Sequence, residues 1–499
     1  MTVNPRTLGG RTVTPLVAML VAAVVALASV GCQASPTPQA TEPPQSPADT
    51  TAAASSPVVV PDHLVLSREA YHLMEEAGDR AWPGWGEAVP PVVVILGDRH
   101  HVLGTPPTDG DWEQVAPGEW VGPPIEGVGP GVQMADRTPF AAMPAVEELQ
   151  QLIDQVVGIG RITLDPPRYL RFVVHEAFHA FQIAALDGEL PDFGLTGDER
   201  ELLPELAEAE IATGVALEAL VLADGLRAET DGDAVTAARE FLDLRAERRT
   251  MMSEDAIALE RALEWTEGLA RYADIALTEA AAEGYDPTLG FAALATYPPR
   301  GAAAEEHLDW LNDLSEVPGT VRDRYYEVGA GEARLLDRLM PGWHSRALPD
   351  AEALESLLAE AVEGAEAGLA PTLRALEARI ISVAGTRLEV AVADRPAFWS
   401  SGLAGVETLA PLEGVLFAFP EPMDVAFTNR GMAFALDVTF FDSQGTYVDA
   451  VVMPACPDEP CDAFRAGGAF RYALEVPSGS ASAFSPGDRL DPGEDGDAG

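Results

Sequence analysis

A segment that begins at Asp165 places two histidines one helical turn apart, and this spacing constrains the fold more than any other feature of the chain. Asp165 and the two prolines after it form a strong helix start, because the carboxylate caps the first turn and proline needs no N–H there. The following RYLRFVVHEAFHAFQIAAL predicts a helix that ends at Asp187-Gly188. His175 and His179 lie on one face of this helix, so both imidazoles can reach the same ion.

Glu176 stands directly after the first histidine. A carboxylate at this position can take a proton from an attacking water and pass it to a leaving amine. A chance match on an amphipathic helix is the alternative, and the helical context of the whole pattern argues against it. The sequence therefore predicts a Zn²⁺ site with His175 and His179 as ligands and Glu176 as general base.

The charge balance limits the partners of the chain. The 499 residues carry 80 acidic side chains against 31 basic ones, and every basic one is arginine. A net charge of -49 excludes nucleic acid as an expected partner. The expected partner is instead the peptide or protein substrate that the HExxH pattern implies. The acidic surface either keeps the protein soluble or reflects a high-salt habitat, where ions screen the repulsion between carboxylates.

The N-terminus has the layout of an export signal, with two arginines before an apolar run that is shorter than a membrane-spanning helix needs. Ser29-Val30-Gly31-Cys32 resembles the lipobox of bacterial lipoproteins, although Ser29 stands where Leu is usual. The resemblance implies a lipoprotein signal peptide at 1–31 and lipidation of Cys32 at the outer face of the cell membrane. Ordinary cleavage that leaves a free thiol is the alternative. Residues 32–60 are rich in Pro, Thr and Ser and predict a disordered linker.

The chain after the linker divides into a helical part and a β part. The pattern from Asp165 to about Ile380 is mainly helical, and after Gly385 it changes to short alternating strands with turn signals. We therefore predict domains at 61–382 and 384–491, and a disordered acidic tail at 492–499 within a Gly/Asp/Pro-rich stretch that begins at Pro486. Earlier elements are expected as a helix at Ser67–Ala77 and strands at Val92–Leu96 and Val132–Ala135.

A third zinc ligand is expected from a second helix, where Glu260, Glu264 and Glu267 share one face. This stretch resembles the second helix of gluzincin metallopeptidases, especially the aminopeptidase N-like group, through Trp265-Thr266-Glu267-Gly268 and the later Tyr272. The resemblance implies that Glu267 is the third ligand. Glu264 or Glu260 as the ligand, or a solvated acidic stripe, are the alternatives. Gly268 is expected to leave room for close packing against the first helix.

Tyr325-Tyr326-Glu327-Val328-Gly329 resembles the Tyr-Glu-Lys-Gly segment of the same group, which implies that the Tyr326 hydroxyl stabilises the oxyanion. Packing of both aromatic rings into the core is the alternative, and His344 and His307 are lesser candidates for the same task. Two departures limit the resemblance. The gap between the two helices is much longer than in the aminopeptidase group, which fits an inserted helical pair, and the segment that holds a free substrate N-terminus is absent from the sequence. Aminopeptidase specificity is therefore not implied.

The C-terminal part resembles the bacterial family known as domain of unknown function 192 over nearly its whole length. The resemblance is carried by EGVLFAFPEPMDVAF, ALDVTFFDSQGTYVDAVVMPACPDEPC and RYALEVPSG, and it implies a compact, mainly β fold. Where members usually show Phe-Trp-Met-Lys-Asn-Thr, this chain has FTNRGM at 427–432. In an exported protein Cys456 and Cys461 predict a local disulfide, with a two-cysteine metal site as the alternative.

Taken together, the sequence predicts a multidomain α+β chain with a mainly helical, zincin-like metallopeptidase domain followed by a small β domain. The expected function is peptide hydrolysis with Zn²⁺ at the cell surface. The alternative is a surface-binding lipoprotein that retains a metallopeptidase scaffold without catalysis.

Overall fold

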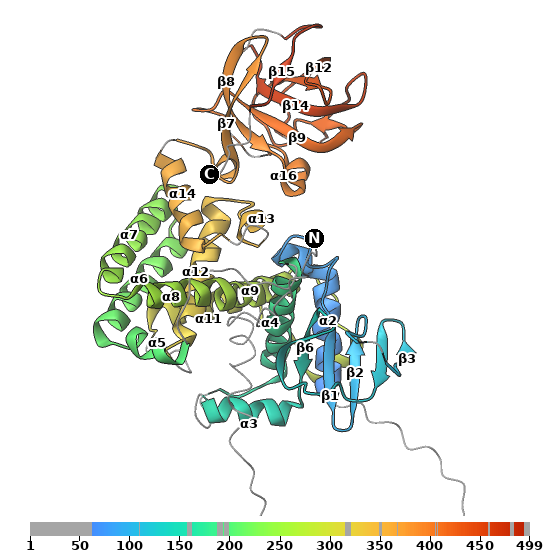
Figure 1. Ribbon diagram of the computed structural model, residues 1–499, viewed down its shortest axis with the longest axis vertical. Coiled ribbons are helices and arrows are strands. Elements are labelled where there is room, and N and C mark those ends of the chain that lie inside the picture. The colour runs from blue at the N-terminus through green and yellow to red at the C-terminus, as the bar shows by residue number, and fades with distance from the viewer. Residues whose placement is uncertain are drawn as a thin grey trace, which may run out of the picture. The chain divides into compact units, whose positions relative to one another are not determined.

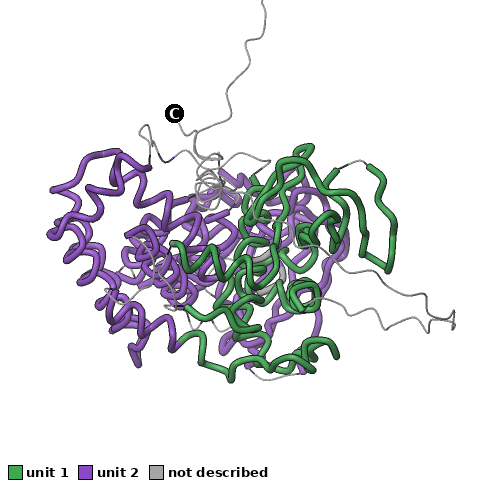
Figure 2. The backbone as a smooth tube through the Cα atoms, turned by 90° about the horizontal axis from the view of Figure 1, so that it is seen from below, with its two compact units in different colours: residues 1–190, 273–304, 318–320 green, residues 191–272, 305–317, 321–499 purple. Residues whose placement is uncertain are grey.

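The computed structural model describes residues 62–493, apart from gaps at 109, 157–161, 187–192, 194–198, 315–320, 349–351, 367, 405, 407, 458–459 and 480–483. The chain divides into two compact units: residues 1–190, 273–304 and 318–320 form unit 1, and the remainder forms unit 2 (Figure 2). The predicted signal peptide, Cys32 and the predicted linker lie outside the described residues. Within the described ranges, no helix is long and apolar enough to cross a membrane.

Unit 1 is built on a six-stranded sheet in the order β3-β4-β2-β1-β6-β5. Strand β1 pairs antiparallel with β2 and parallel with β6, and β5 pairs antiparallel with β6 at one edge. Helices α2 and α4 pack on this sheet (Figure 1). The elements are α2 (Asp62–Ala81), β1 (Val92–Leu96), β2 (Arg99–Leu103), β3 (Glu113–Ala116), β4 (Glu119–Gly122), β5 (Gly131–Ala135), β6 (Thr138–Met143), α3 (Val146–Val156) and α4 (Pro166–Ala185).

Helix α4 starts as the sequence predicts. The Asp165 carboxylate accepts a hydrogen bond from the Arg168 N–H at 2.9 Å, and proline occupies the first helical position. The inner face of the helix is apolar, and Ala180 and Ile183 pack with Val132 of β5 in one buried cluster. This packing fixes α4 beside the edge strand of the sheet.

Unit 2 contains a helical part in which α6 packs along α7 and in which α12 packs against α6, α14 and a short π-helical turn, η1. Helix α8, η1 and α9 form one continuous helical segment, and the boundary between the units falls inside α9. The helices that follow α4 are α5 (Glu199–Leu206), α6 (Ala209–Arg227), α7 (Asp231–Arg249), α8 (Glu254–Leu263), η1 (Glu264–Gly268), α9 (Leu269–Ala281), α10 (Leu289–Leu294), α11 (Ala302–Asn312), α12 (Asp323–Leu339), α13 (His344–Ala347), α14 (Leu354–Glu366) and α15 (Pro371–Arg374).

The C-terminal β domain is a seven-stranded sheet in the order β12-β11-β14-β9-β8-β7-β15 with a separate pair, β10 and β13. Strands β8 and β9 are parallel, and the other neighbours in the large sheet are antiparallel. The elements are β7 (Glu377–Val383), β8 (Thr386–Ala393), α16 (Pro396–Ser401), β9 (Gly414–Met423), β10 (Phe427–Thr428), β11 (Leu436–Phe441), β12 (Tyr447–Met453), β13 (Ala463–Phe464), β14 (Phe470–Pro477) and β15 (Leu490–Asp491).

Three boundaries differ from those expected from the sequence. Helix α2 is longer than Ser67–Ala77 and starts at Asp62. The large C-terminal sheet begins at Glu377, before the predicted boundary near 383, because β7 pairs along its whole length with β8. Strand β15 lies inside the stretch from Pro486 that predicts disorder, and it pairs with the end of β7. Strands β7 and β8 form a hairpin of neighbouring segments, whereas local composition did not reveal the β15 pairing because its partner β7 lies far away in the chain.

Candidate metal centre

His175 and His179 lie one turn apart on α4 with their Nε2 atoms 3.1 Å from each other. Two nitrogens that bind one tetrahedral zinc at about 2.0–2.1 Å lie roughly 3.3–3.4 Å apart, so this spacing fits a shared ion. The Nδ1 atom of His179 lies 2.9 Å from Gln182 Oε1, which only accepts hydrogen bonds. Nδ1 therefore carries the proton, and the lone pair of His179 is on Nε2, the atom nearer His175.

Gln182 was not singled out in the sequence. It stands three residues after His179 on the same helix, and this spacing is the signal that could have identified it as an orienting residue.

The Glu176 carboxylate faces the edge strand β5. Its Oε2 atom accepts a hydrogen bond from the backbone N–H of Val132 at 2.9 Å. Val132 lies opposite Ala141 in the β5–β6 pair, at the edge of the described sheet. The edge strand thus fixes the carboxylate of the predicted general base.

Glu267 lies on η1, a π-helical turn between α8 and α9, with only 4% of its surface exposed. Such turns occur mostly as single bulges inside α-helices, frequently at functional sites. The turn crosses α12 at very short range: a Cβ on Gly268 would lie 2.7 Å from the Gly329 Cα, and one on Gly329 would lie 2.5 Å from the Glu264 carbonyl oxygen. Gly268 therefore allows close packing against α12, and the expectation that it serves packing against the first helix is wrong.

This crossing brings the Glu267 and Tyr326 motifs together. The Tyr326 hydroxyl forms a hydrogen bond with Glu267, and burial together with the Glu267 carboxylate holds the tyrosine pKa well above its ordinary value. Arg322, one turn earlier, donates from Nη2 to Glu267 Oε1 at 2.5 Å, and its guanidinium lies over the Tyr326 ring, 5.8 Å from the centroid. Tyr325, by contrast, is 1% exposed and belongs to the core.

The three predicted ligands form one group. His175, His179 and Glu267 each offer one ligand atom, and these atoms all lie within 4.8 Å of one another. Two imidazoles and one carboxylate are a donor set that suits Zn²⁺ with one position left open. The residues present therefore fit a catalytic zinc in both number and chemistry.

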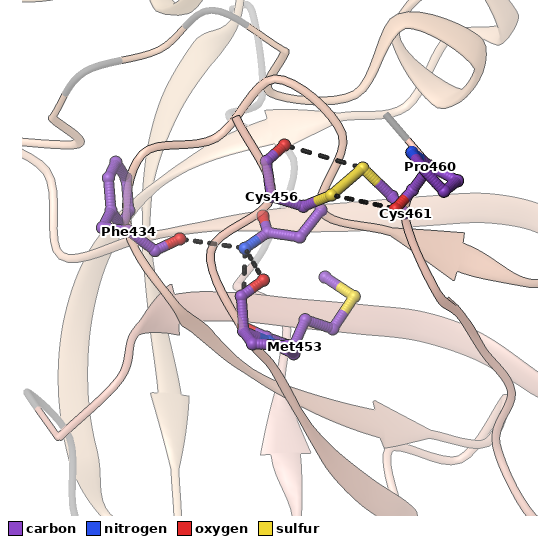
Figure 3. Close-up of a disulfide and its surroundings, with 7 residues drawn as sticks. Phe434, Met453, Cys456, Pro460 and Cys461 are labelled. Atoms are coloured by element: carbon purple, nitrogen blue, oxygen red, sulfur yellow. Dashed lines mark hydrogen bonds between the residues drawn. A yellow bond between two sulfur atoms is a disulfide. The ribbon is translucent and has the colours of Figure 1, made fainter. Parts of the chain in front are cut away.

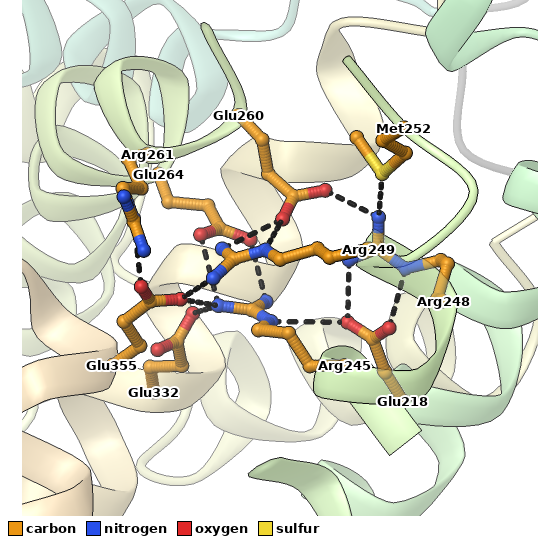
Figure 4. A network of polar contacts seen from close by, with 10 residues as sticks. All are labelled: Glu218, Arg245, Arg248, Arg249, Met252, Glu260, Arg261, Glu264, Glu332 and Glu355. Carbon is orange, nitrogen blue, oxygen red and sulfur yellow. Dashed lines mark hydrogen bonds and ion pairs between the residues drawn. The ribbon is translucent and has the colours of Figure 1, made fainter. Parts of the chain in front are cut away.

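Glu260 and Glu264, the alternative ligands, are engaged elsewhere. Both are buried, and Figure 4 shows them in a network with arginines of α7. Arg245 donates from Nη2 to Glu264 Oε1 at 2.6 Å, and Arg248 donates from Nη1 to Glu260 Oε2 at 2.6 Å. The alternative of a solvated acidic stripe is wrong for these two residues, because each carboxylate is paired inside the helical core.

The two lesser histidine candidates also have partners. His307 is fully buried, with Nε2 2.8 Å from the Glu327 carbonyl oxygen and Nδ1 2.5 Å from Arg334 Nη1, which is the environment of a core residue. His344 stacks on Trp343 and lies 2.9 Å from the Tyr272 hydroxyl, and burial lowers its pKa to about 3. Both imidazoles are therefore held within unit 2 by their own neighbours.

In the C-terminal domain Cys456 and Cys461 form a disulfide (Figure 3). The divergent FTNRGM segment lies against it: the Gly431 N–H donates to the Cys456 carbonyl at 2.9 Å, and the Cys456 N–H donates to the Met432 carbonyl at 3.0 Å. Asn429 is buried and donates from Nδ2 to the carbonyls of Phe434 and Pro454. This segment therefore has a structural role in holding the disulfide loop.

Comparison with known proteins identifies only the C-terminal part. Residues 379–492 match the family DUF192, described as an uncharacterized ACR. Two solved structures are similar: a candidate transcription regulator from Sinorhizobium meliloti 1021 has 26% identity, covers 23% of this chain and 94% of its own, and has a TM-score of 0.21. A protein of unknown function from Novosphingobium aromaticivorans DSM 12444 has 23% identity, covers 25% of this chain and 90% of its own, and has a TM-score of 0.22.

No curated protein matches the chain. The prediction of a domain of unknown function 192 is confirmed by the family match. The chain is multidomain and α+β, and its C-terminal residues 379–492 form a DUF192 domain.

Proposed function

We propose that the chain is a zinc metallopeptidase of the zincin type, anchored by lipid to the outer face of a bacterial cell membrane. The observation that carries the proposal is the group of His175, His179 and Glu267, whose ligand atoms lie within 4.8 Å of one another. These three residues would hold the ion. Zinc, when bound, supplies a Lewis acid that polarises a carbonyl and acidifies water.

Glu176 is the general base in this proposal. Its carboxylate takes the proton of the attacking water and delivers it to the leaving amine. The Val132 N–H donates to Oε2 of the same carboxylate at 2.9 Å, and this bond fixes the direction of the base. The hydroxyl of Tyr326, beside Glu267, donates a hydrogen bond to the oxyanion that develops during attack.

The peptide substrate lies along β5. Strand β5 is at the end of the described sheet order, next to α4, and an extended peptide can add to such an edge through backbone hydrogen bonds. Adding a strand there would place the scissile bond near Glu176, because Val132 of this strand already contacts that carboxylate. The proposal therefore favours extended peptide segments over folded surfaces.

The membrane anchor rests on the sequence alone. The lipobox-like Ser29-Val30-Gly31-Cys32 and the Pro/Thr/Ser-rich stretch after it suit a tethered enzyme whose folded part stands off the surface. The strongly acidic composition keeps nucleic acid outside the expected partners.

The test is hydrolysis of a library of extended peptides by the full chain loaded with zinc. Glu176→Gln removes the base while keeping both histidines, so we expect a loss of about 10²–10⁴-fold in kcat/KM with zinc content unchanged. Glu147→Gln, an exposed glutamate of α3, is the matched control and should behave like the wild type. Equal hydrolysis by Glu176→Gln would contradict the proposal. A wild-type chain that binds zinc without cleaving any peptide would favour the surface-binding lipoprotein.

A further inference from the structure

Arg322 lies immediately before α12, where it contacts the predicted third ligand. Its Nη2 donates to Glu267 Oε1 at 2.5 Å, and only 12% of its side chain is exposed. A second carboxylate, that of Glu199, lies 3.5 Å from Nε. The guanidinium also lies over the ring of Tyr326, one helical turn further along. Two carboxylates and an aromatic ring thus hold this cation in place.

We propose that Arg322 is a positioning residue of the candidate metal centre, which fixes the orientation of the Glu267 carboxylate and thereby sets the affinity of the chain for a divalent cation. This inference rests on the proposed function and extends it, because it assigns a role to a residue outside the gluzincin-like motifs.

The physical reason lies in the freedom of a glutamate side chain. Glu267 sits on a π-helical turn with 4% of its surface exposed, and its buried carboxylate ends a long side chain with several rotatable bonds. A charge-assisted bond to one carboxylate oxygen restricts that rotation before any ion arrives. Carboxylates that bind metals are commonly held in this way, and loss of such a partner typically weakens metal binding by about 10–100-fold.

Arginine and lysine should differ at this position. The guanidinium has a planar set of donors that can reach Glu267 and stack over Tyr326 at the same time. An ammonium keeps the charge without that shape. A residue that merely neutralises Glu267 would be replaced equally well by lysine, whereas a residue that orients it would be replaced only in part.

The experiment measures the zinc dissociation constant of the full chain by competition with a chelator, without using peptide hydrolysis as the readout. Arg322→Met should weaken zinc binding by about 10–100-fold, and Arg322→Lys should recover part of the loss. Arg324→Met, two positions further along the chain at a partly exposed position of α12, is the matched control and should bind zinc like the wild type. Circular dichroism of the metal-free variants shows whether each one is folded.

Wild-type affinity in a folded Arg322→Met variant would overturn the inference, and tighter binding would do the same by showing that the guanidinium competes with the ion. If Arg322→Met fails to fold, Arg322→Lys decides: full wild-type affinity overturns the positioning role, and a clear loss supports it. The two proposals fail separately. If Arg322→Met binds zinc more weakly than the wild type, but the zinc-loaded wild type cleaves no peptide, this inference stands and the proposed peptidase activity fails.

Discussion

In the helical part of unit 2, Glu264 and Glu332 are buried around the guanidinium of Arg245, whereas in the C-terminal β domain Glu475 is buried between Val415 and Val438 of the neighbouring strands. The helical carboxylates accept hydrogen bonds from arginine. Burial alone raises the pKa of the Glu475 carboxyl to about 8. The helical acids are thus buried against a shared arginine, although burial still raises the pKa of Glu332 to about 7, whereas Glu475 is buried as a neutral group at pH 7.

The arginine network also bears on which glutamate we propose as the metal ligand. Glu260, Glu264 and Glu267 follow one another on a continuous helical segment, and the sequence gives all three the same helical face. Arginines of α7 engage the first two, while Glu267 lies beyond that network and meets Arg322 and Tyr326. All three glutamates therefore contact arginine, and the proposed ligand is the one whose carboxylate is grouped with His175 and His179, which helical spacing alone could not decide.

Removing the central arginine of the network should have the largest effect. Arg245 is 2% exposed and donates to Glu218, Glu264 and Glu332. Arg245→Met leaves these carboxylates buried without their shared cation, so we expect a loss of about 3–5 kcal/mol in the free energy of unfolding at pH 7. Denaturant unfolding of the full chain measures this loss. Arg239→Met, at a partly exposed position of α7 where the arginine pairs with Glu366, should change stability by less than about 1 kcal/mol. Equal effects of the two substitutions would contradict the account.

Glu475 should give the β domain a dependence on alkaline pH. Its pKa in the folded chain, about 8, lies above the ordinary value of 4.5, so at neutral pH the folded state holds a proton that the unfolded chain has lost. The resulting stabilisation is full below pH 4.5 and is lost as the pH rises through 8. Between pH 6 and 9 the free energy of unfolding should fall by about 2–3 kcal/mol. Denaturant titrations of the wild type and Glu475→Gln at several pH values measure the free energy of unfolding. The variant should not show the loss of about 2–3 kcal/mol that Glu475 causes in the wild type. Identical pH profiles would show that Glu475 is charged when folded.

Glu332 should show the smallest effect, because arginine partly offsets its burial. Burial raises its pKa to about 7, and Arg245 donates to its Oε1 at 2.9 Å. With the folded pKa raised, stability is lost as the pH rises through 7, by about 1 kcal/mol between pH 6 and 8. Glu332→Gln keeps an acceptor for Arg245, so it should match the wild type at pH 6 and exceed its stability at pH 8. A variant destabilised by several kcal/mol at both values would mean that the charge of Glu332 is required.

Local signals predicted the parts of the molecule that local chemistry determines. Asp165 and the following prolines set the start of α4, and the spacing of His175 and His179 set their shared face. The DUF192 domain was recognisable because its pattern spans a whole domain, as the family match confirms. The Cys456–Cys461 disulfide closes a loop short enough to be read from sequence separation.

Features that depend on contacts between distant residues could not be predicted from the sequence. Helical spacing could not distinguish a solvated acidic stripe from glutamates buried against Arg245 and Arg248, because the arginines come from another helix. The backbone that packs against Gly268 is that of Gly329, about 60 residues further along the chain. The sequence therefore predicted close packing at Gly268 but not the helix against which it packs. Arg322 carries no motif of its own, and only the crossing of η1 and α12 places it beside Glu267.

The most direct test of the central claim is the zinc content of the full chain after equilibration with Zn²⁺ and removal of unbound metal, measured by mass spectrometry. We expect about one zinc per chain in the wild type and in Glu254→Gln, an exposed position on α8, and little zinc in Glu267→Gln. A wild-type chain without zinc, or a Glu267→Gln variant that retains as much zinc as the wild type, would contradict the metal centre formed by His175, His179 and Glu267.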